Sequence, residues 1–283
     1  MDDAAGGACE LATSDDALLG GRLILRQPAR GHRVGTDAIL LAAAAPVGGV
    51  ERLVDVGAGV GAVGLALLAR LSGATADLVE RDAACGALAQ ENAARNGFAA
   101  RTRVFCIDIG AARARRAAGL GDEAADLVVT NPPFFDARTI RASPEPRRAQ
   151  AHVLEGESTP AAGPSALARW IVASLGLLRA GGRFVMIHRP EALAPLLDAF
   201  GRRLGAIAIL PVHPNAAAPA HRVLVAGVKG ARGPLSLRPG LVLHDRAGAF
   251  TPLAAALHRG EAVIDWGEAA RRGRRVDRNG GPH

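Results

Sequence analysis

Short apolar runs alternate with segments of helical periodicity through the middle of the chain. Six of these runs predict strands, near residues 52–56, 76–80, 102–107, 126–130, 183–187 and 205–212. The segments between them predict helices, near residues 60–71, 82–96, 111–118, 164–179 and 190–203. Strands that are joined through helices pair in parallel. The alternation therefore predicts a doubly wound α/β fold with a mostly parallel sheet.

One strand of this sheet is expected to run against the others. A seventh apolar run, residues 221–228, follows the sixth after only residues 214–220. Because so short a connection cannot hold a helical crossover, the last two strands should form an antiparallel hairpin. The predicted fold is a seven-stranded sheet with one antiparallel strand near its edge.

The chain is expected to form a single domain with a flexible segment at each end. Residues 1–20 are small and acidic, which predicts a mobile leader, and residues 267–283 carry a basic run that predicts a disordered tail. Residues 21–266 then form one domain, with its core at residues 51–229.

Two smaller units flank the predicted core. In residues 21–50, a strand at 22–26 is expected to pair with 31–35 as a hairpin and to lead into a helix that Thr36 caps. In residues 230–266, the pattern predicts a small extension of strand, turn and helix. Both units should pack onto the core.

The most informative motif is the tetrapeptide Asn131-Pro132-Pro133-Phe134, directly after the predicted strand at 126–130. Open α/β sheets bind ligands at the carboxyl ends of their strands. Two successive prolines make a stiff turn that fixes one amide, one carbonyl and one aromatic ring. The Asn131 oxygen and the Pro132 carbonyl suit the two hydrogens of an exocyclic amine, and Phe134 suits the face of a base. The alternative is a structural loop that only ends a strand.

A glycine-rich turn is the second motif. Gly57, Gly59 and Gly61 follow the predicted strand at 52–56 and precede a helical pattern. Glycine permits a sharp turn and the close approach of a ligand, and the helix start offers free N–H groups. Such a turn alone serves NAD, FAD or S-adenosylmethionine. Glu80 ends the next apolar run, where an acidic residue grips ribose hydroxyls in folds of this kind.

Together these motifs resemble the ligand-binding motifs of class I S-adenosylmethionine-dependent methyltransferases. The resemblance rests on residues 55–61, Glu80, Asp108 and residues 131–134. It implies a Rossmann-like methyltransferase sheet. The Asn-Pro-Pro-Phe form is similar to the subset that methylates amino groups, namely adenine N6, guanine N2 or glutamine N5.

A further resemblance lies on the amino-terminal side. Gln27-Pro28 and residues 31–41 resemble the entry segment of the bacterial tRNA1(Val) adenine N6-methyltransferase family, and the match runs from about residue 21 to about residue 266. That family modifies the purine just 3′ of the anticodon, adenine 37. The resemblance therefore implies that the chain methylates an adenine of the tRNA anticodon loop.

The resemblance implies a role for each motif residue. The glycine turn should line the methionine part of S-adenosyl-L-methionine, Glu80 the ribose hydroxyls and Asp108 the adenine amine. Asp55 either braces the glycine turn or reaches the amino group of the donor. The residues assigned to the cofactor are Asp55, Gly57, Gly59, Gly61, Glu80, Asp108, Asn131, Thr36 and Asp37. The residues assigned to catalysis are Asn131, Pro132 and Phe134.

A long irregular segment, residues 135–163, follows the tetrapeptide. Segments of this length inside a domain are usually functional or disordered. Its arginines suit RNA phosphates, and the alternative is a solvated loop that is rich in arginine like the rest of the chain. The residues assigned to the RNA contact are His32, Arg33, Phe135, Arg147 and Arg148. We therefore expect tRNA as the partner.

Composition adds modest constraints. The formal net charge is +7, which favours an acidic partner, but Lys229 is the only lysine and a GC-rich coding bias toward arginine explains part of the excess. Three cysteines show no metal-ligand spacing, so we expect no metal. No apolar run reaches transmembrane length, and the amino terminus lacks the pattern of a signal peptide. We expect a cytoplasmic monomer without membrane contact.

Other functions stay open at this stage. Methylation of guanine N2 in ribosomal RNA, or of glutamine N5 in a release factor, uses a similar turn, but those groups usually carry an additional amino-terminal domain. A DNA adenine methyltransferase would be expected to carry a target-recognition domain. A nicotinamide-dependent oxidoreductase could use the glycine turn and Glu80, but it would leave residues 131–134 unexplained. A non-catalytic RNA-binding module is a further alternative.

Overall fold

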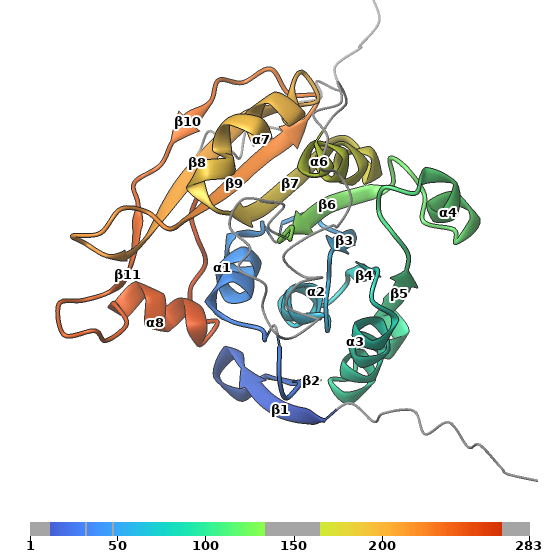
Figure 1. Cartoon of the computed structure of the whole chain (residues 1–283), viewed down its shortest axis with the longest axis horizontal. Coiled ribbons are helices and arrows are strands. Elements are labelled where there is room, and N and C mark those ends of the chain that lie inside the picture. The colour runs from blue at the N-terminus through green and yellow to red at the C-terminus, as the bar shows by residue number, and fades with distance from the viewer. Residues whose placement is uncertain (1–11, 32, 47, 134–164, 268–283) are drawn as a thin grey trace, which may run out of the picture.

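The computed structural model describes residues 12–31, 33–46, 48–133 and 165–267 (Figure 1). A central sheet contains the seven predicted core strands. These are β3 (Arg52–Val56), β4 (Thr75–Glu80), β5 (Thr102–Cys106), β6 (Ala125–Thr130), β7 (Leu178–His188), β8 (Leu204–Asn215) and β9 (Arg222–Lys229). Two short strands follow them in the chain, β10 (Ser236–Leu237) and β11 (Leu241–His244).

The strand order is β10-β8-β9-β7-β6-β3-β4-β5, and β11 also pairs with β8. The pairs from β7 through β6, β3 and β4 to β5 are parallel. Strand β9 is antiparallel to both β7 and β8. The predicted doubly wound sheet with one reversed strand near its edge is thus confirmed. The extension adds β10 and β11 in parallel to β8, so the sheet has nine strands within the described residues rather than seven.

Helices cover both faces of the sheet (Figure 1). They are α1 (Thr36–Ala44), α2 (Ala62–Leu68), α3 (Ala83–Arg95), α4 (Ala112–Ala117), α6 (Ala166–Leu177), α7 (Leu193–Phe200) and α8 (Pro252–His258). Single 3-10 turns occur at Leu19–Gly21, Ala99–Arg101 and Pro190–Ala192. Within the part of the chain that the structure describes, none of these helices has the length and apolar character needed to cross a membrane.

Alternation along each strand divides the core into two clusters. In β3, Leu53 belongs to the cluster that contains residues of α1, α2 and α8, whereas its neighbour Val54 belongs to the cluster that contains residues of α6 and α7. Their exposed fractions are 0% and 1%. Successive side chains of a strand point to opposite faces. Because both faces are covered, the central strands are mostly apolar on both faces, which explains why the sequence pattern located them well.

The amino-terminal hairpin differs from the prediction. β1 (Thr13–Leu18) pairs antiparallel with β2 (Leu23–Pro28). The prediction that residues 13–20 belong to a mobile leader is therefore wrong, as is the prediction that residues 31–35 pair with the strand at β2. The physical reason is that β1 is a polar strand whose residues alternate between exposed and half-buried positions, so it lacks an apolar pattern.

The hairpin docks on α3 through side-chain amides. Asn92 exchanges two hydrogen bonds with the backbone of Arg26, at 2.7 and 2.9 Å. Asn96, one helical turn later, does the same with Ile24, at 2.9 and 2.8 Å. Asp15 of β1 pairs with the Arg26 guanidinium at 3.0 Å. The two side-chain amides thus pair with backbone N–H and C=O groups at the edge of β2, as a neighbouring strand would.

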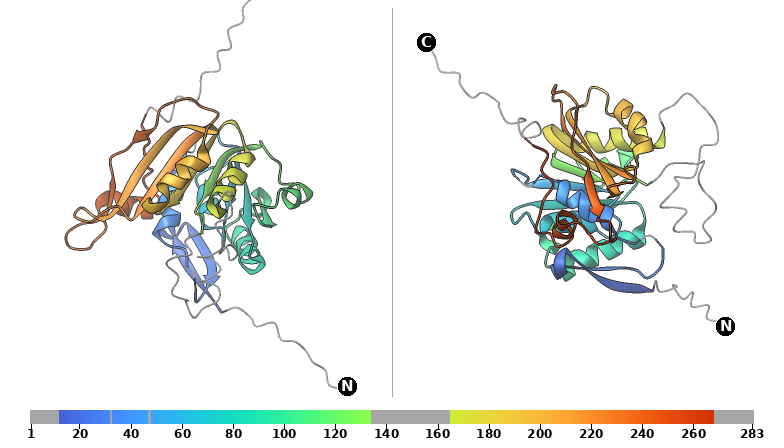
Figure 2. Two further views of the ribbon diagram at one scale, coloured as in Figure 1. Left: turned by 45° about the horizontal axis from the view of Figure 1, so that its top comes forward. Right: turned by 90° about the vertical axis from the view of Figure 1, so that its left-hand side faces the viewer.

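The carboxyl-terminal extension is fixed to α1. In Figures 1 and 2, α8 and the segment after it lie beside that helix. The backbone N–H of Ile264 donates to the Ala43 carbonyl at 2.9 Å, and the Trp266 indole N–H donates to the Ala44 carbonyl at 2.7 Å. The predicted extension is therefore an integral part of the fold.

Candidate functional site

The predicted site residues follow the ends of adjacent strands. Val56, the last residue of β3, pairs in register with Thr130, the last residue of β6. Gly57 and Asn131 therefore begin their turns side by side. Glu80 ends β4, the neighbour of β3 on its other side. The carboxyl edge of the sheet thus brings the glycine turn, the asparagine turn and the acidic residue together.

The three glycines of the turn have different physical roles. The φ angles of Gly57, Gly59 and Gly61 are 75°, 56° and 89°, in the left-handed region that disfavours side chains. A Cβ on Gly57 would lie 3.0 Å from the Trp170 ring, and one on Gly61 would lie 3.2 Å from Leu78. A Cβ on Gly59 would meet no atom within 4 Å. Gly57 and Gly61 thus permit packing within the chain, and Gly59 is the member that faces open space.

Glu80 braces the glycine turn. Its half-buried carboxylate accepts a hydrogen bond from the Gly59 backbone N–H at 2.8 Å on one oxygen and from the Asp82 N–H at 2.8 Å on the other. Each carboxylate oxygen has two acceptor positions, so both retain capacity for a further donor. Asp82 in turn caps α3 by accepting from two backbone N–H groups. Glu80 therefore connects the open part of the turn to the start of α3.

Asp55 is buried beneath the same turn. It is 1% exposed, and its carboxylate accepts a hydrogen bond from the Gly64 N–H in the first turn of α2 at 2.8 Å. Burial is the main cause that raises the pKa of Asp55 from 3.8 to about 7, and the nearby Glu80 carboxylate adds to it. Of its two predicted roles, this geometry favours bracing of the turn over contact with a ligand.

The raised pKa of Asp55 predicts a pH-dependent stability. The folded protein holds this proton more tightly than the unfolded chain, so stability should fall as pH rises from about 4 to about 7 and then level off. The decrease is on the order of 4–5 kcal/mol, since the pKa rises by about three units and one unit corresponds to about 1.4 kcal/mol. Asp55→Asn keeps an acceptor for Gly64 but does not ionise. Urea unfolding at several pH values measures the free energy of unfolding of both proteins, and the difference between wild type and variant should show this decrease. If the free energies of both proteins depend on pH in the same way, the prediction is wrong.

The asparagine turn is anchored through the residue that directly precedes it. Asn131 is half-buried and Pro132 is buried. Thr130, directly before them, donates a hydrogen bond from its hydroxyl to the Val56 carbonyl at 2.7 Å. The Asn131 side-chain amide makes no hydrogen bond to any other residue that the structure describes. A half-buried amide that the fold itself does not use suits a ligand with polar hydrogens.

Other assigned residues have partners within the chain. Asp37 pairs with Arg222 at 2.8 Å, and the Thr36 hydroxyl lies 3.2 Å from Nε2 of His258. Thr36 is the first residue of α1, and its predicted place as N-cap belongs to Gly35. The assignment of Thr36 and Asp37 to the cofactor stays a prediction.

The remaining assignments divide in two. Asp108 is exposed beyond β5 and accepts from the Gly110 N–H at 2.7 Å, and Arg33 is exposed and pairs with Asp16. Both are accessible at the surface. The other catalytic and RNA-contact assignments lie outside the described residues, and so does the long segment at 135–163. They are His32, Phe134, Phe135, Arg147 and Arg148.

Comparison with known proteins identifies the family to which the chain belongs. The Methyltransferase small domain family model matches residues 33–144. A crystal structure of protein Atu636 from Agrobacterium tumefaciens, described as a predicted O-methyltransferase, is 31% identical with a TM-score of 0.66. The alignment covers 81% of this chain and 98% of that one. The chain belongs to the class I S-adenosylmethionine-dependent methyltransferases. The predicted cofactor is the methyl donor that defines this family.

More specific relatives match a shorter part of this methyltransferase. The tRNA1(Val) (adenine(37)-N6)-methyltransferase of Enterobacter sp. (strain 638) is 41% identical over 119 residues, and that of Escherichia coli O157:H7 is 37% identical over 119 residues. The matched segment is 42% of this chain and 46% of each relative, so it spans about half the length of these curated proteins.

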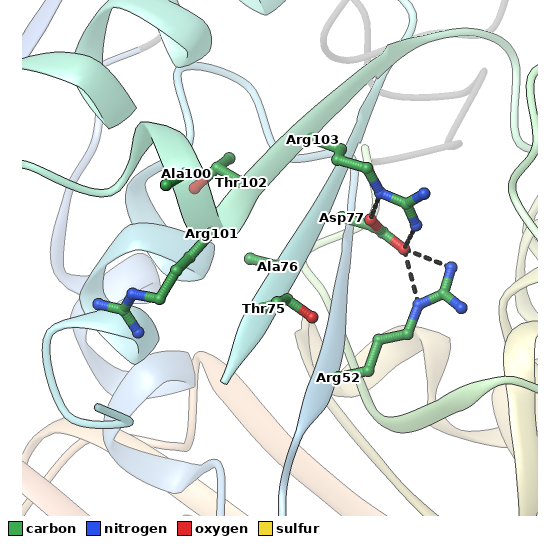
Figure 3. A pocket seen from close by; sticks show the side chains of 8 residues that line it. All are labelled: Arg52, Thr75, Ala76, Asp77, Ala100, Arg101, Thr102 and Arg103. Carbon is green, nitrogen blue, oxygen red and sulfur yellow. Dashed lines mark hydrogen bonds and ion pairs between the residues drawn. The ribbon is translucent and has the colours of Figure 1, made fainter. Parts of the chain in front are cut away.

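A pocket at the opposite edge of the methyltransferase sheet has another character (Figure 3). Asp77 is 2% exposed and accepts from Arg52 at 2.7 Å and from Arg103 at 2.8 Å, beside a pocket of about 330 Å³. These three charged side chains lie toward the amino-terminal ends of β3, β4 and β5, whereas the glycine turn follows the carboxyl end of β3. Among the residues that the structure places, no group of three His, Cys, Asp or Glu side chains could hold a metal ion.

Sequence reasoning missed three residues that hold the site together. Trp170 packs on Gly57 and donates to Thr130 at 3.0 Å. Asn92 is fully buried and donates to the Val60 carbonyl of the glycine turn at 3.0 Å. The scarcity of aromatic residues was one indication of Trp170, since the chain has only two tryptophans. None of these contacts of Trp170, Thr130 and Asn92 could be found from local sequence patterns, because each joins distant segments.

Proposed function

We propose that this methyltransferase transfers a methyl group from S-adenosylmethionine to the N6 amine of an adenine in tRNA, at position 37 of the tRNA1(Val) anticodon loop. The observation that carries the proposal is the Asn131-Pro132 turn beside the glycine turn, with an amide that the described fold leaves available. The two relatives named for adenine-37 methylation support the choice of target.

The Asn131-Pro132 turn suits the chemistry of an aromatic amine. The N6 lone pair is delocalised into the ring, so the amine is a poor nucleophile until its hydrogens are held. The Asn131 side-chain oxygen and the Pro132 carbonyl would accept these two hydrogens and direct the lone pair toward the methyl group. Their partial negative charge would also stabilise the positive charge that develops on N6. Phe134 is assigned to stack on the base after it leaves its neighbours.

The donor side fits S-adenosylmethionine by its contacts. When bound, this cofactor supplies an electrophilic methyl group. Gly59 offers backbone without a side chain toward open space, and the Glu80 carboxylate beside it retains acceptor positions for ribose hydroxyls. Asp108, exposed at the same edge, would accept from the adenine amine. Asp55 would keep the turn in place from below.

A comparison of acceptors tests the proposal. Purified protein is incubated with methyl-labelled S-adenosylmethionine and, in separate reactions, with total tRNA, ribosomal RNA and a release factor. All three acceptors are taken from cells that lack the gene. The proposal expects label in tRNA alone, recovered after digestion as N6-methyladenosine. Label in guanine of ribosomal RNA or in protein would replace the proposal with that alternative. Binding of NADH in place of S-adenosylmethionine would reject the whole class.

A salt titration tests the assigned RNA contact. Affinity for tRNA should fall steeply with salt, because arginines that contact phosphates release counterions. Replacing Arg147 and Arg148 together with alanine should weaken binding and reduce the salt slope by roughly one to two units. The matched control replaces the exposed Arg202 and Arg232, which lie at the opposite edge of the sheet, and it should leave the slope unchanged. Equal slopes for both double variants would remove the segment from the contact surface.

A further inference from the structure

Trp170 of α6 lies against the glycine turn and donates to Thr130, the residue directly before the Asn131-Pro132 turn. Its ring lies against Gly57, where an added Cβ would be only 3.0 and 3.1 Å from two ring carbons. The same position on Gly57 is 3.9 Å from the backbone oxygen of Asn131. Trp170 itself is half-buried. The lack of a side chain at Gly57 therefore makes room for a residue of this chain, because the indole occupies the space that a Gly57 side chain would need.

Thr130 completes the connection. Its hydroxyl accepts a hydrogen bond from the Trp170 indole N–H at 3.0 Å and donates one to the Val56 carbonyl at 2.7 Å. Thr130 is 0% exposed, so no water competes for these bonds. Val56 directly precedes the glycine turn, and Thr130 directly precedes Asn131. One buried hydroxyl thus joins the ends of β3 and β6, directly before the glycine turn and the Asn131-Pro132 turn.

We infer that Trp170 and Thr130 are positioning residues that set the separation and angle between the glycine turn and the Asn131-Pro132 turn. The inference rests on the proposed function, in which the first turn holds the methyl donor and the second the target amine. Transfer requires the reacting atoms in line at about 3–3.5 Å, and a displacement of about 1 Å can cost about 10²-fold in rate. A link between the backbones of both turns acts directly on this geometry.

The arrangement separates two kinds of effect. Neither side chain is assigned to touch the donor or the base, so loss of their hydrogen bonds should affect the rate of transfer more than the affinity for either ligand. A merely structural pair would instead lower stability, with kcat and donor affinity unchanged in the folded fraction. Separate measurements of kcat and of the Kd for the methyl donor therefore distinguish the two roles.

The kinetic test uses near-isosteric variants. Trp170→Phe keeps an aromatic ring near Gly57 but lacks the indole N–H, and Thr130→Val keeps the shape but lacks the hydroxyl. Each should lower kcat for tRNA methylation by about 10- to 100-fold, with the Kd for S-adenosylhomocysteine changed less than about twofold. The double variant should be scarcely slower than the slower single variant, because both changes remove the same link. Trp266→Phe, which loses a buried indole bond far from both turns, should keep the wild-type kcat.

A second readout needs no RNA substrate. The chain has two tryptophans, so in Trp266→Phe the remaining indole emission comes from Trp170. Titration with S-adenosylhomocysteine should change this emission with the Kd that calorimetry gives, and adding Thr130→Val should reduce the change. If wild type methylates none of the acceptors, the proposed function fails, and the emission still decides the inference. Wild-type kcat in both single variants, or an emission that ignores bound S-adenosylhomocysteine, would overturn the positioning role.

Discussion

Asn131→Ala is expected to lower the rate of methyl transfer by about 10²–10³ while S-adenosylmethionine binding stays mostly intact. Loss of one preorganised hydrogen-bond partner of a developing charge typically has an effect of this size. The effect should appear in kcat, because the contact matters more in the transition state than in the ground state. The amide has no hydrogen bond to other described residues, so its removal should not unfold the site. Single-turnover kinetics with tRNA would measure the change.

Pro132→Ala is the matched control for this variant. It keeps the backbone carbonyl that is assigned to the second amino hydrogen, while it loosens the turn and adds a backbone N–H at a buried position. Its effect on kcat should therefore be much smaller than that of Asn131→Ala. If Asn131→Ala turns over at a rate close to wild type, or if the two variants are equally impaired, the assignment of the amide to the target amine is wrong.

Glu80→Ala is expected to weaken S-adenosylmethionine binding by about 1.5–3 kcal/mol, the typical value for hydrogen bonds to a charged group. The structure shows a complication, because the same carboxylate accepts from Gly59 and Asp82. Part of the loss could come from a displaced turn rather than from the ribose. Calorimetry of a single ligand cannot separate these contributions.

A comparison of two ligands separates them. S-adenosylhomocysteine and its 2′-deoxy analogue are titrated into wild type and into Glu80→Ala. If the carboxylate holds the ribose, the missing hydroxyl weakens binding to wild type and has little effect in the variant. Equal effects of the missing hydroxyl in both proteins would leave Glu80 as a brace of the turn only. Asp82→Ala, which removes the cap of α3 but keeps the Glu80 carboxylate, is the matched control.

The sequence predicted the parts of this fold that depend on local patterns. Strands buried on both faces are mostly apolar, so β3, β4 and β6 were located to within a residue or so. The short connection at residues 214–220 was enough to predict the reversed strand β9. The polar strand β1 could not be found in this way, because its stability comes from pairing with β2 and from amides on α3.

The position of the motif residues at one edge of the sheet was predictable, but their contacts with one another and with distant residues were not. Motif spacing brought Gly57, Glu80 and Asn131 to one edge, as the parallel register requires. It could not show that Gly57 makes room for Trp170, since that helix position is set by packing. It likewise could not show that Thr130 bonds a residue 40 positions away. Such long-range contacts fix the relative geometry of the two turns.

One measurement tests the central claim most directly. The protein is incubated with deuterated-methyl S-adenosylmethionine and an unmodified tRNA1(Val) transcript, and the digested RNA is analysed by mass spectrometry. A transcript with guanine in place of adenine 37 is the matched control. The account predicts deuterated N6-methyladenosine in the fragment that contains position 37 and none in the control. Equal labelling of both transcripts, or label on a guanine, would contradict it.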